Sequence, residues 1–268
     1  MKKIISVILF ILIALPVWAI TMQGSDGGTI QGGSAKMQGG GFSPLSLAPV
    51  AWYDASSSAS FTFNGANVSQ WNDISGNGNH LTQATAVDQP LYNSASPATV
   101  EFDGVSEFMQ GPAFTQGVIA QPFTIVCVSQ NITLATQTVY VDSIDGTNDA
   151  LVYEISGFDR MFAGGVDVMD GNASTLNKQM LATVFNGDSS LFYTNTSAGP
   201  DTSSQAGEPG SNSLGGVTLS AFNSGLSGYR NQKIHAVLIV DRELTVSELD
   251  QLGNYYQQRY GNVWIPSS

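Results

Sequence analysis

The sequence has very little cysteine or histidine. Its 268 residues include one cysteine, Cys127, and two histidines, His80 and His235. A single cysteine excludes an intramolecular disulfide, so the stability of the fold must come from an apolar core. Cys127 lies in the apolar run 123–128, where we expect a small buried residue rather than a nucleophile. We expect His80 to be a turn residue and His235 to be a hydrogen-bonded residue of a strand.

Charged residues are also scarce, and most of them are acidic. They make up 11% of the chain, with 9 basic residues against 21 acidic ones, for a net charge of −12. An average globular protein has about 25%. The negative excess repels phosphate backbones and anionic lipid, which argues against nucleic acid and membrane surfaces as partners. Hydrophobic residues make up 42% of the chain, which is enough for a sizeable core.

The N-terminus has the pattern of an export signal. Two lysines precede an apolar run over 4–15, and Val17 and Ala19 occupy the −3 and −1 positions of a cleavage site. We predict a signal peptide over 1–19, cleaved after Ala19, and a secreted or cell-surface protein with no membrane association after cleavage. An uncleaved membrane anchor is the alternative, although the run is shorter than the roughly 20 residues of a membrane span.

A glycine-rich segment follows the signal. Residues 20–41 contain eight glycines among Gln and Ser residues, a composition typical of a flexible linker. No repeat of about 20–50 residues is visible after it, which argues against a solenoid or propeller. We therefore predict one domain over 42–268.

Short apolar segments separated by turn residues predict an all-β domain. Many short strands at this spacing are typical of a sandwich or jelly roll. Asn186-Gly187 predicts a hairpin with a two-residue turn. The last segment is apolar on both faces, so we expect it near the centre of a sheet. The predicted strands are 98–102, 123–128, 138–142, 150–155, 181–185, 190–194 and 233–241.

One helix is predicted near the C-terminus, over 246–259. Thr245 and Glu248 have the spacing of a capping box, in which side chain and backbone groups of the two residues bond reciprocally. Gly261 is a stop signal. Three apolar residues fall on one face of this helix, namely Leu249, Leu252 and Tyr256.

Several motifs together resemble a known family. Trp52-Tyr-Asp-Ala55 is followed by Trp71-Asn-Asp-Ile-Ser-Gly-Asn-Gly-Asn-His80, then by Val100-Glu-Phe-Asp-Gly104 and, near the end, by Tyr260-Gly261. This order resembles the laminin-G-like, or concanavalin A-like, jelly-roll domains of secreted bacterial and phage virion proteins, over residues 42–264. The resemblance implies a two-sheet antiparallel jelly-roll sandwich with one short C-terminal helix. It also implies carbohydrate or protein binding or appendage structure, sometimes with bound calcium.

We predict that the protein is not an enzyme but an exported binding module that recognises a glycan or a surface protein. The alternative is a structural protein of a phage virion or cell-surface appendage, with self-assembly. A glycoside hydrolase is the third candidate, because relatives of this fold use a pair of carboxylates. Glu101 and Asp103 are the nearest pair here, but the turn at Asp103 carries Glu107 away from them.

Aromatic residues near these motifs are candidates for ligand binding. Trp52, Trp71 and Tyr53 could stack on sugar rings, with Tyr140 and Tyr153 as further candidates. The alternative is that each aromatic side chain belongs to the core, which is common for a Trp beside a strand.

The loop before His80 is a candidate metal site. Asp73, Asn77 and Asn79 could donate three side-chain oxygens to Ca2+ from a loop bent by two glycines, and Asp54 or Asp103 could complete the site. The alternative is a purely structural loop whose polar side chains bond the backbone. No other cofactor is predicted.

Overall fold

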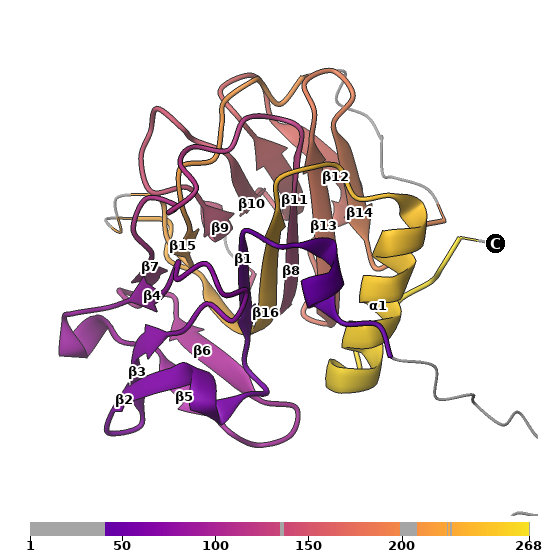
Figure 1. Ribbon diagram of the computed structural model, residues 1–268. Coiled ribbons are helices and arrows are strands. Elements are labelled where there is room, and N and C mark those ends of the chain that lie inside the picture. The colour runs from indigo at the N-terminus through magenta and orange to yellow at the C-terminus, as the bar shows by residue number, and fades with distance from the viewer. Residues whose placement is uncertain (1–40, 135–136, 199–207, 224, 226, 268) are drawn as a thin grey trace, which may run out of the picture. The chain divides into compact units, whose positions relative to one another are not determined.

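The computed structural model describes residues 41–134, 137–198, 208–223, 225 and 227–267 (Figure 1). The predicted signal peptide, 1–19, and the predicted linker, 20–41, lie outside these residues except for Gly41. Within the described part of the chain, no helix has the length and apolar character to cross a membrane.

The described part of the chain is all-β with one α-helix near its C-terminus, as predicted. The helix is α1 (Val246–Tyr260), and short 3-10 helices occur at Pro44–Leu47, Ser58–Ser60 and Ala86–Asp88. The strands are β1 (Ala51–Asp54), β2 (Phe61–Asn64), β3 (Asn67–Trp71), β4 (Leu81–Thr82), β5 (Leu91–Asn93), β6 (Thr99–Asp103), β7 (Met109–Gln110), β8 (Phe123–Asn131), β9 (Gln137–Asp142), β10 (Leu151–Ile155), β11 (Phe158–Phe162), β12 (Val168–Ala173), β13 (Lys178–Phe185), β14 (Leu191–Thr194), β15 (Thr218–Leu219) and β16 (Asn231–Val240).

The strands pair antiparallel along one path, β12-β11-β10-β9-β15-β7-β4-β3-β5-β6-β16-β8-β13-β14, and β1 and β2 join it at β16 and β3. The path folds back on itself, so its end strands β12 and β14 come into contact. β16 pairs with β8 along one edge and with β6 and β1 along the other. The expectation that this strand is central is therefore confirmed.

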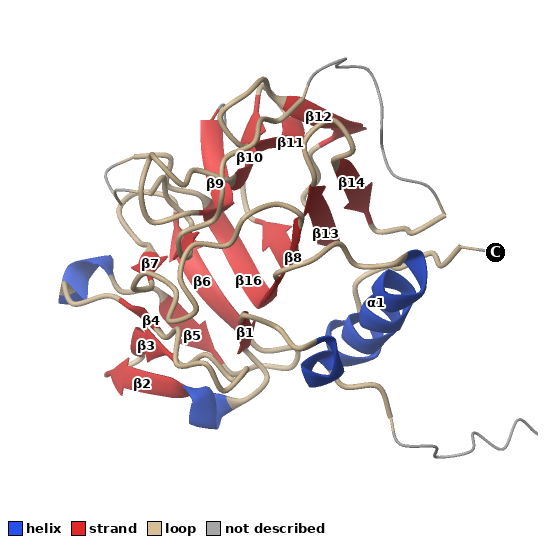
Figure 2. Ribbon diagram, turned by 45° about the horizontal axis from the view of Figure 1, so that its top comes forward, coloured by secondary structure: helices blue, strands red, loops and turns tan. Residues whose placement is uncertain are grey.

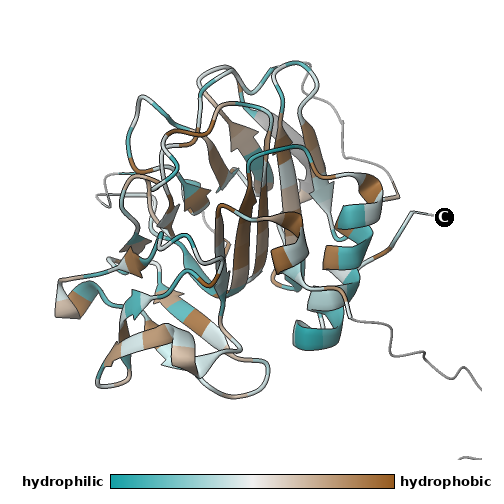
Figure 3. Cartoon of the chain, viewed as in Figure 1, coloured by the Kyte–Doolittle hydropathy of each residue, from teal (hydrophilic) through white to brown (hydrophobic). Residues whose placement is uncertain are grey.

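Apolar side chains alternate between two faces of the central strands. On β8, Ile125 and Cys127 point into the core between the two layers, together with Tyr140 and Val152 of the opposite layer. Val126 and Val128 point to the other face, as the two-residue period of a strand requires. Figure 3 shows this concentration of hydrophobic residues on β8 and β16.

α1 covers the outer face of the β8–β13–β16 layer (Figure 2). Its predicted apolar face is buried there through Leu249, Leu252 and Tyr256. The capping box of Thr245 and Glu248 is present in both directions, and Gly261 ends the helix in the left-handed conformation. Helix start, helix end and buried face are therefore as predicted.

The seven predicted strands are present, but the predicted hairpin turn is wrong. β13 and β14 do pair, with Val184 opposite Leu191. Five residues, 186–190, separate the strands in place of a two-residue turn. The Ser190 hydroxyl bonds both the Asn186 N–H, at 2.8 Å, and the Gly187 carbonyl, at 2.7 Å. This side chain closes a wider loop than the dipeptide indicates.

Candidate functional site

The carboxylate of Asp73, predicted as a metal ligand, accepts four hydrogen bonds. Its Oδ1 accepts from the backbone N–H of Trp52 at 2.9 Å and of Ser75 at 2.8 Å. Its Oδ2 accepts from the Ser75 hydroxyl at 2.8 Å and from the Asn79 N–H at 3.0 Å. Both oxygens are therefore directed at hydrogen-bond donors of the loop and of β1.

The two asparagines of the loop are engaged in the same way. Asn79 Oδ1 accepts from the Thr115 N–H at 3.0 Å, and its amide donates to the Val50 carbonyl at 2.8 Å. The Asn77 amide donates to the carbonyls of Pro49 and Val50 at 2.9 and 3.0 Å. Gly76 and Gly78 have φ of 97° and 78°, the left-handed values that glycine permits.

These residues do not fit a calcium ion. A cation repels the N–H groups that point at Asp73, and calcium needs six to eight free oxygens. Asp54 faces Arg259 at 3.2 Å, and Asp103 Oδ1 accepts from the Val105 N–H at 2.8 Å, so neither is free to complete a site. Among the described residues, no group of three or more His, Cys, Asp or Glu side chains is placed to hold a metal.

The three predicted aromatic ligands are core residues. Trp52 is 7% exposed, and Tyr53 and Trp71 are fully buried. The Tyr53 hydroxyl donates to the Asn79 carbonyl, and its ring lies 5.9 Å from that of Trp71. A sugar ring cannot reach these faces, so the prediction that they bind ligand is wrong. Tyr140 is also buried, with the Arg230 guanidinium 3.7 Å above its ring.

The carboxylates weighed for catalysis bond to neighbouring groups. Glu101 forms an ion pair with Lys233 at 3.0 Å. Burial raises the pKa of Glu101, but hydrogen bonds from Asn93 and Lys233 outweigh it and leave the pKa below its ordinary value. Glu107 accepts from the Asp103 N–H at 2.8 Å, and partial burial beside Asp103 raises its pKa to about 7. The Glu107 contact closes the β6–β7 turn, and the Glu101 ion pair links β6 to β16.

Aromatic side chains instead line a cavity on the outer face of β9, β10 and β11, which we call the aromatic pocket. Its volume is about 190 Å³, and its apolar side consists of Leu151, Tyr153, Phe162 and Phe222. These residues belong to a separate apolar cluster, on the face opposite the main core. β10 and β11 supply the first three, and Phe222 comes from the segment after β15.

Polar side chains border the aromatic pocket. Gln137, Asp149 and Asp167 lie at its edge. The Tyr153 hydroxyl donates to Asp167 Oδ1, and Arg160 lies 3.6 Å from the other Asp167 oxygen. Burial and the neighbouring Asp167 raise the pKa of Tyr153, so its hydroxyl stays protonated. Hydrogen-bond acceptors therefore surround a small aromatic surface.

Asp149 contributes a buried oxygen atom at this edge. Its Oδ1 has no hydrogen-bond partner among the described atoms. Burial raises the pKa of Asp149, and burial together with the Asp149 charge raises that of its neighbour Asp142 to about 9. The two carboxyl groups therefore lie close enough for the charge of one to disfavour ionisation of the other.

Sequence reasoning named only one aromatic residue of this pocket, Tyr153, and only as a further candidate. Phe162 lies on β11, a strand that the prediction missed because Asp159 and Arg160 interrupt its apolar pattern. Phe222 lies in an irregular segment between two strands. The signal that could have found them is aromatic residues close to Gly, Asp and Asn residues.

Another cavity, with a volume of about 570 Å³, lies beside the 73–79 loop. Its lining includes three glutamines, Gln70, Gln83 and Gln110, together with His80 and Phe108. His80 Nδ1 accepts from the Asp73 N–H at 3.0 Å, consistent with the expected turn residue. Gln110 already donates to the Thr218 hydroxyl at 2.8 Å. With one aromatic residue, this cavity offers less to a sugar ring than the aromatic pocket.

No protein-family model and no curated protein matches the sequence, so the predicted laminin-G-like family is not confirmed. Solved structures are similar in fold. Trypanosoma rangeli sialidase in complex with sialic acid matches with a TM-score of 0.54 and 15% identity, over 78% of this chain and 33% of the sialidase chain. The binding domain of Paraclostridial Mosquitocidal Protein 1 matches with a TM-score of 0.57 and 14% identity, over 81% of this chain and 56% of that chain.

The binding domain of botulinum neurotoxin serotype D/C VPI 5993 is similar to the same degree, with a TM-score of 0.57 and 14% identity, over 82% of this chain and 56% of that chain. This chain therefore spans about a third of the sialidase chain and about half of each toxin domain. At such low identity the likeness shows the all-β fold alone.

Proposed function

We propose that this domain is a non-catalytic carbohydrate-binding module that holds one sugar residue in the aromatic pocket. The observation that carries the proposal is the grouping of two partly exposed rings, Phe162 and Phe222, beside Asp149 and Asp167. Aromatic rings pack against the C–H face of a sugar, and carboxylate oxygens accept hydrogen bonds from its hydroxyls.

The negative charge around the aromatic pocket limits the class of sugar that it can bind. Two carboxylates border the pocket, in a chain with a net charge of −12, so a neutral or amino sugar is favoured over an acidic one. Two similar structures are toxin binding domains, and a third is a sialidase in complex with sialic acid. A sugar-bound structure and two binding domains of similar fold support a binding role for this domain.

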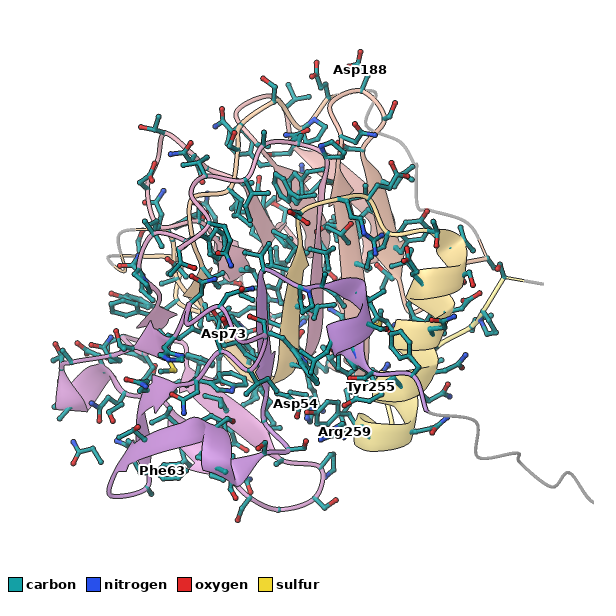
Figure 4. All side chains as sticks on the ribbon, in the orientation of Figure 1. Asp54, Phe63, Asp73, Asp188, Tyr255 and Arg259 are labelled. Carbon is teal, nitrogen blue, oxygen red and sulfur yellow. The ribbon has the colours of Figure 1, made fainter. Side chains whose placement is uncertain are left out.

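A glycan array followed by titration calorimetry tests the proposal. The domain should bind a neutral or amino sugar saturably, and Phe222→Ala should weaken binding about tenfold or more, since stacking area is lost. Phe63→Ala is the matched control, because Phe63 is an exposed aromatic residue on β2 at a distance from the pocket (Figure 4). Absence of saturable binding, or equal losses in both variants, contradicts the proposal.

A further inference from the structure

A third cavity, of about 190 Å³, lies beside the C-terminal end of α1 and contains basic side chains. We call it the basic pocket. Lys178, Lys233 and His235 line one side, and the turn between β5 and β6 forms the other. Of the described residues that line it, none is Asp or Glu. In a chain with only 9 basic residues and a net charge of −12, this grouping stands out.

Strand register brings the two lysines together. Lys178 on β13 and Lys233 on β16 both lie opposite Gln130 on β8. Residues directly opposite in antiparallel strands share a face of the sheet, so the three side chains form one row. The charge of Lys233, after burial, lowers the pKa of Lys178, which shows that the two ammonium groups are close enough to repel each other.

Each ammonium group keeps donors for a ligand. Lys178 donates to the Tyr260 carbonyl at the end of α1, and Lys233 pairs with Glu101 at 3.0 Å. An ammonium group has three N–H donors. Two donors on each lysine therefore remain after these contacts.

His235 adds a buried acceptor. The pairing of β16 with β8 shifts register between Ile234 and Ala236, so His235 occupies a β-bulge, an irregularity that redirects a side chain. The residue is 1% exposed. Nδ1 lies 2.9 Å from the Ala98 carbonyl and must carry a hydrogen to bond it, whereas Nε2 has no partner. A buried polar atom without a partner is costly, which points to a ligand group that donates to it.

The imidazole is neutral at physiological pH. Burial and the charge of Lys178 lower its pKa to about 4, although the Ala98 carbonyl and Asp54 oppose the shift. With Nδ1 protonated toward Ala98, Nε2 presents a lone pair. The basic pocket thus offers cationic donors and one neutral acceptor.

We propose that the basic pocket binds an acidic sugar, whose carboxylate lies against Lys178 and Lys233 and one of whose hydroxyls donates to Nε2 of His235. A halide or sulfate ion has no hydrogen to donate to Nε2, and a neutral sugar lacks an anionic partner for the two ammonium groups. This site is independent of the aromatic pocket, which favours neutral or amino sugars over acidic ones.

Titration calorimetry with sodium glucuronate, against glucose at equal ionic strength, tests the proposal. Glucuronate should bind saturably and at least tenfold more tightly than glucose. Lys178→Gln and Lys233→Gln, which keep a hydrogen-bond donor but lose the charge, should each weaken binding about tenfold. Arg242→Gln is the charge-matched control, since Arg242 pairs with Glu248 before α1. Phe222→Ala should leave glucuronate binding unchanged, which separates this site from the aromatic pocket.

Nitrogen NMR of the unmodified protein provides a second test. Its result does not depend on whether the lysine variants fold. The Nε2 resonance of His235 should shift on adding glucuronate and stay in place on adding sodium sulfate. Equal binding of glucose and glucuronate overturns the proposal. So does displacement of glucuronate by equimolar sulfate, an Nε2 resonance that does not respond, or unchanged affinity in both lysine variants.

Discussion

At the scale of single residues, one carboxylate organises the loop between β3 and β4. Asp73 is 6% exposed and bonds to Trp52, Ser75 and Asn79. Trp52 belongs to β1, so this side chain ties the loop to a strand 21 residues earlier in the chain. A hydrogen bond to a charged group contributes about 1.5–3 kcal/mol. The loop therefore depends on Asp73 more than on any bound ion.

Replacing Asp73 with alanine should lower the free energy of unfolding by about 2–4 kcal/mol, because the buried N–H groups of Trp52 and Asn79 lose their acceptor. Urea denaturation measures the change. Asp188→Ala is the control, since Asp188 is exposed in the β13–β14 loop, away from Asp73 (Figure 4). A loss below about 0.5 kcal/mol, the usual range for surface positions, contradicts the structural role.

Calcium provides a separate check on the same loop. The melting temperature of the unmodified protein should stay constant when calcium or a chelator is added, since the Asp73 oxygens already accept four hydrogen bonds. An ion that binds only the folded state, at a free concentration of a hundred times its Kd, would raise the free energy of unfolding by about 2.7 kcal/mol. A rise in melting temperature that Asp73→Ala abolishes would restore the metal hypothesis.

At the scale of elements, the N-terminus of α1 is stabilised by hydrogen bonds among three neighbouring residues. Thr245 and Glu248 form the capping box, and Arg242 donates two hydrogen bonds to the Glu248 carboxylate, at 2.8 and 2.9 Å. The helix covers Val126 and Leu238 on the outer face of the sheet. Loss of its first turn would loosen the cover over this apolar cluster.

Thr245→Ala should destabilise the domain by about 1 kcal/mol, the usual cost of removing an N-cap side chain. The hydroxyl that accepts from the Glu248 N–H is lost. Thr245→Ser keeps the hydroxyl and should remain within a few tenths of a kcal/mol of the original. Chemical denaturation of the two variants gives the comparison, and equal stabilities would argue against the cap.

Glu248 should make stability depend on pH. Hydrogen bonds from Arg242, the largest cause, lower its pKa to about 2 from an ordinary value of 4.5. A depressed pKa means that the carboxylate stabilises the fold above about 4.5 and that this contribution is lost as the pH falls toward 2. Glu248→Gln should remove this part of the pH dependence, whereas Asp241→Asn, an exposed acid after β16, should keep it. Identical pH profiles for all three proteins would contradict the assignment.

At the scale of the whole molecule, β8 is the strand that contributes side chains to both apolar clusters, the main core and the cluster under α1. It pairs with β13 and β16, and its alternate side chains enter the main core and the cluster under α1. Cys127 lies opposite Leu181 and Val237 on its two neighbours, 1% exposed. The thiol can therefore meet solvent only when the sheet itself opens.

Thiol labelling should report global unfolding. Burial raises the pKa of Cys127 to about 12, so the folded protein holds almost no reactive thiolate at neutral pH. Labelling by a disulfide reagent should be slow without denaturant and should rise with urea along the same curve as the loss of β-sheet signal. Rapid labelling of the folded protein would show that the core opens locally at β8.

Much of the fold follows from local pattern. The segments 123–128 and 233–241 are long and apolar on both faces, and they are the central strands. β4, β7 and β15 have two residues each, too few to carry a period, and they exist because their neighbours in the sheet supply partners. β11 was missed for a different reason, because Asp159 and Arg160 interrupt its apolar pattern.

The sequence by itself determined the all-β class, the capped C-terminal helix, the buried thiol and the bend of the glycine loop, because each depends on spacing along the chain. Tertiary structure decided the rest. Trp52, Tyr53 and Trp71 are core residues because the sheet folds over them, and Phe162 and Phe222 meet only where β11 and the segment after β15 converge. Lys178 and Lys233 are 55 positions apart (233 minus 178) and form one row through register alone. Such contacts depend on strand pairing over long separations, which no local period encodes.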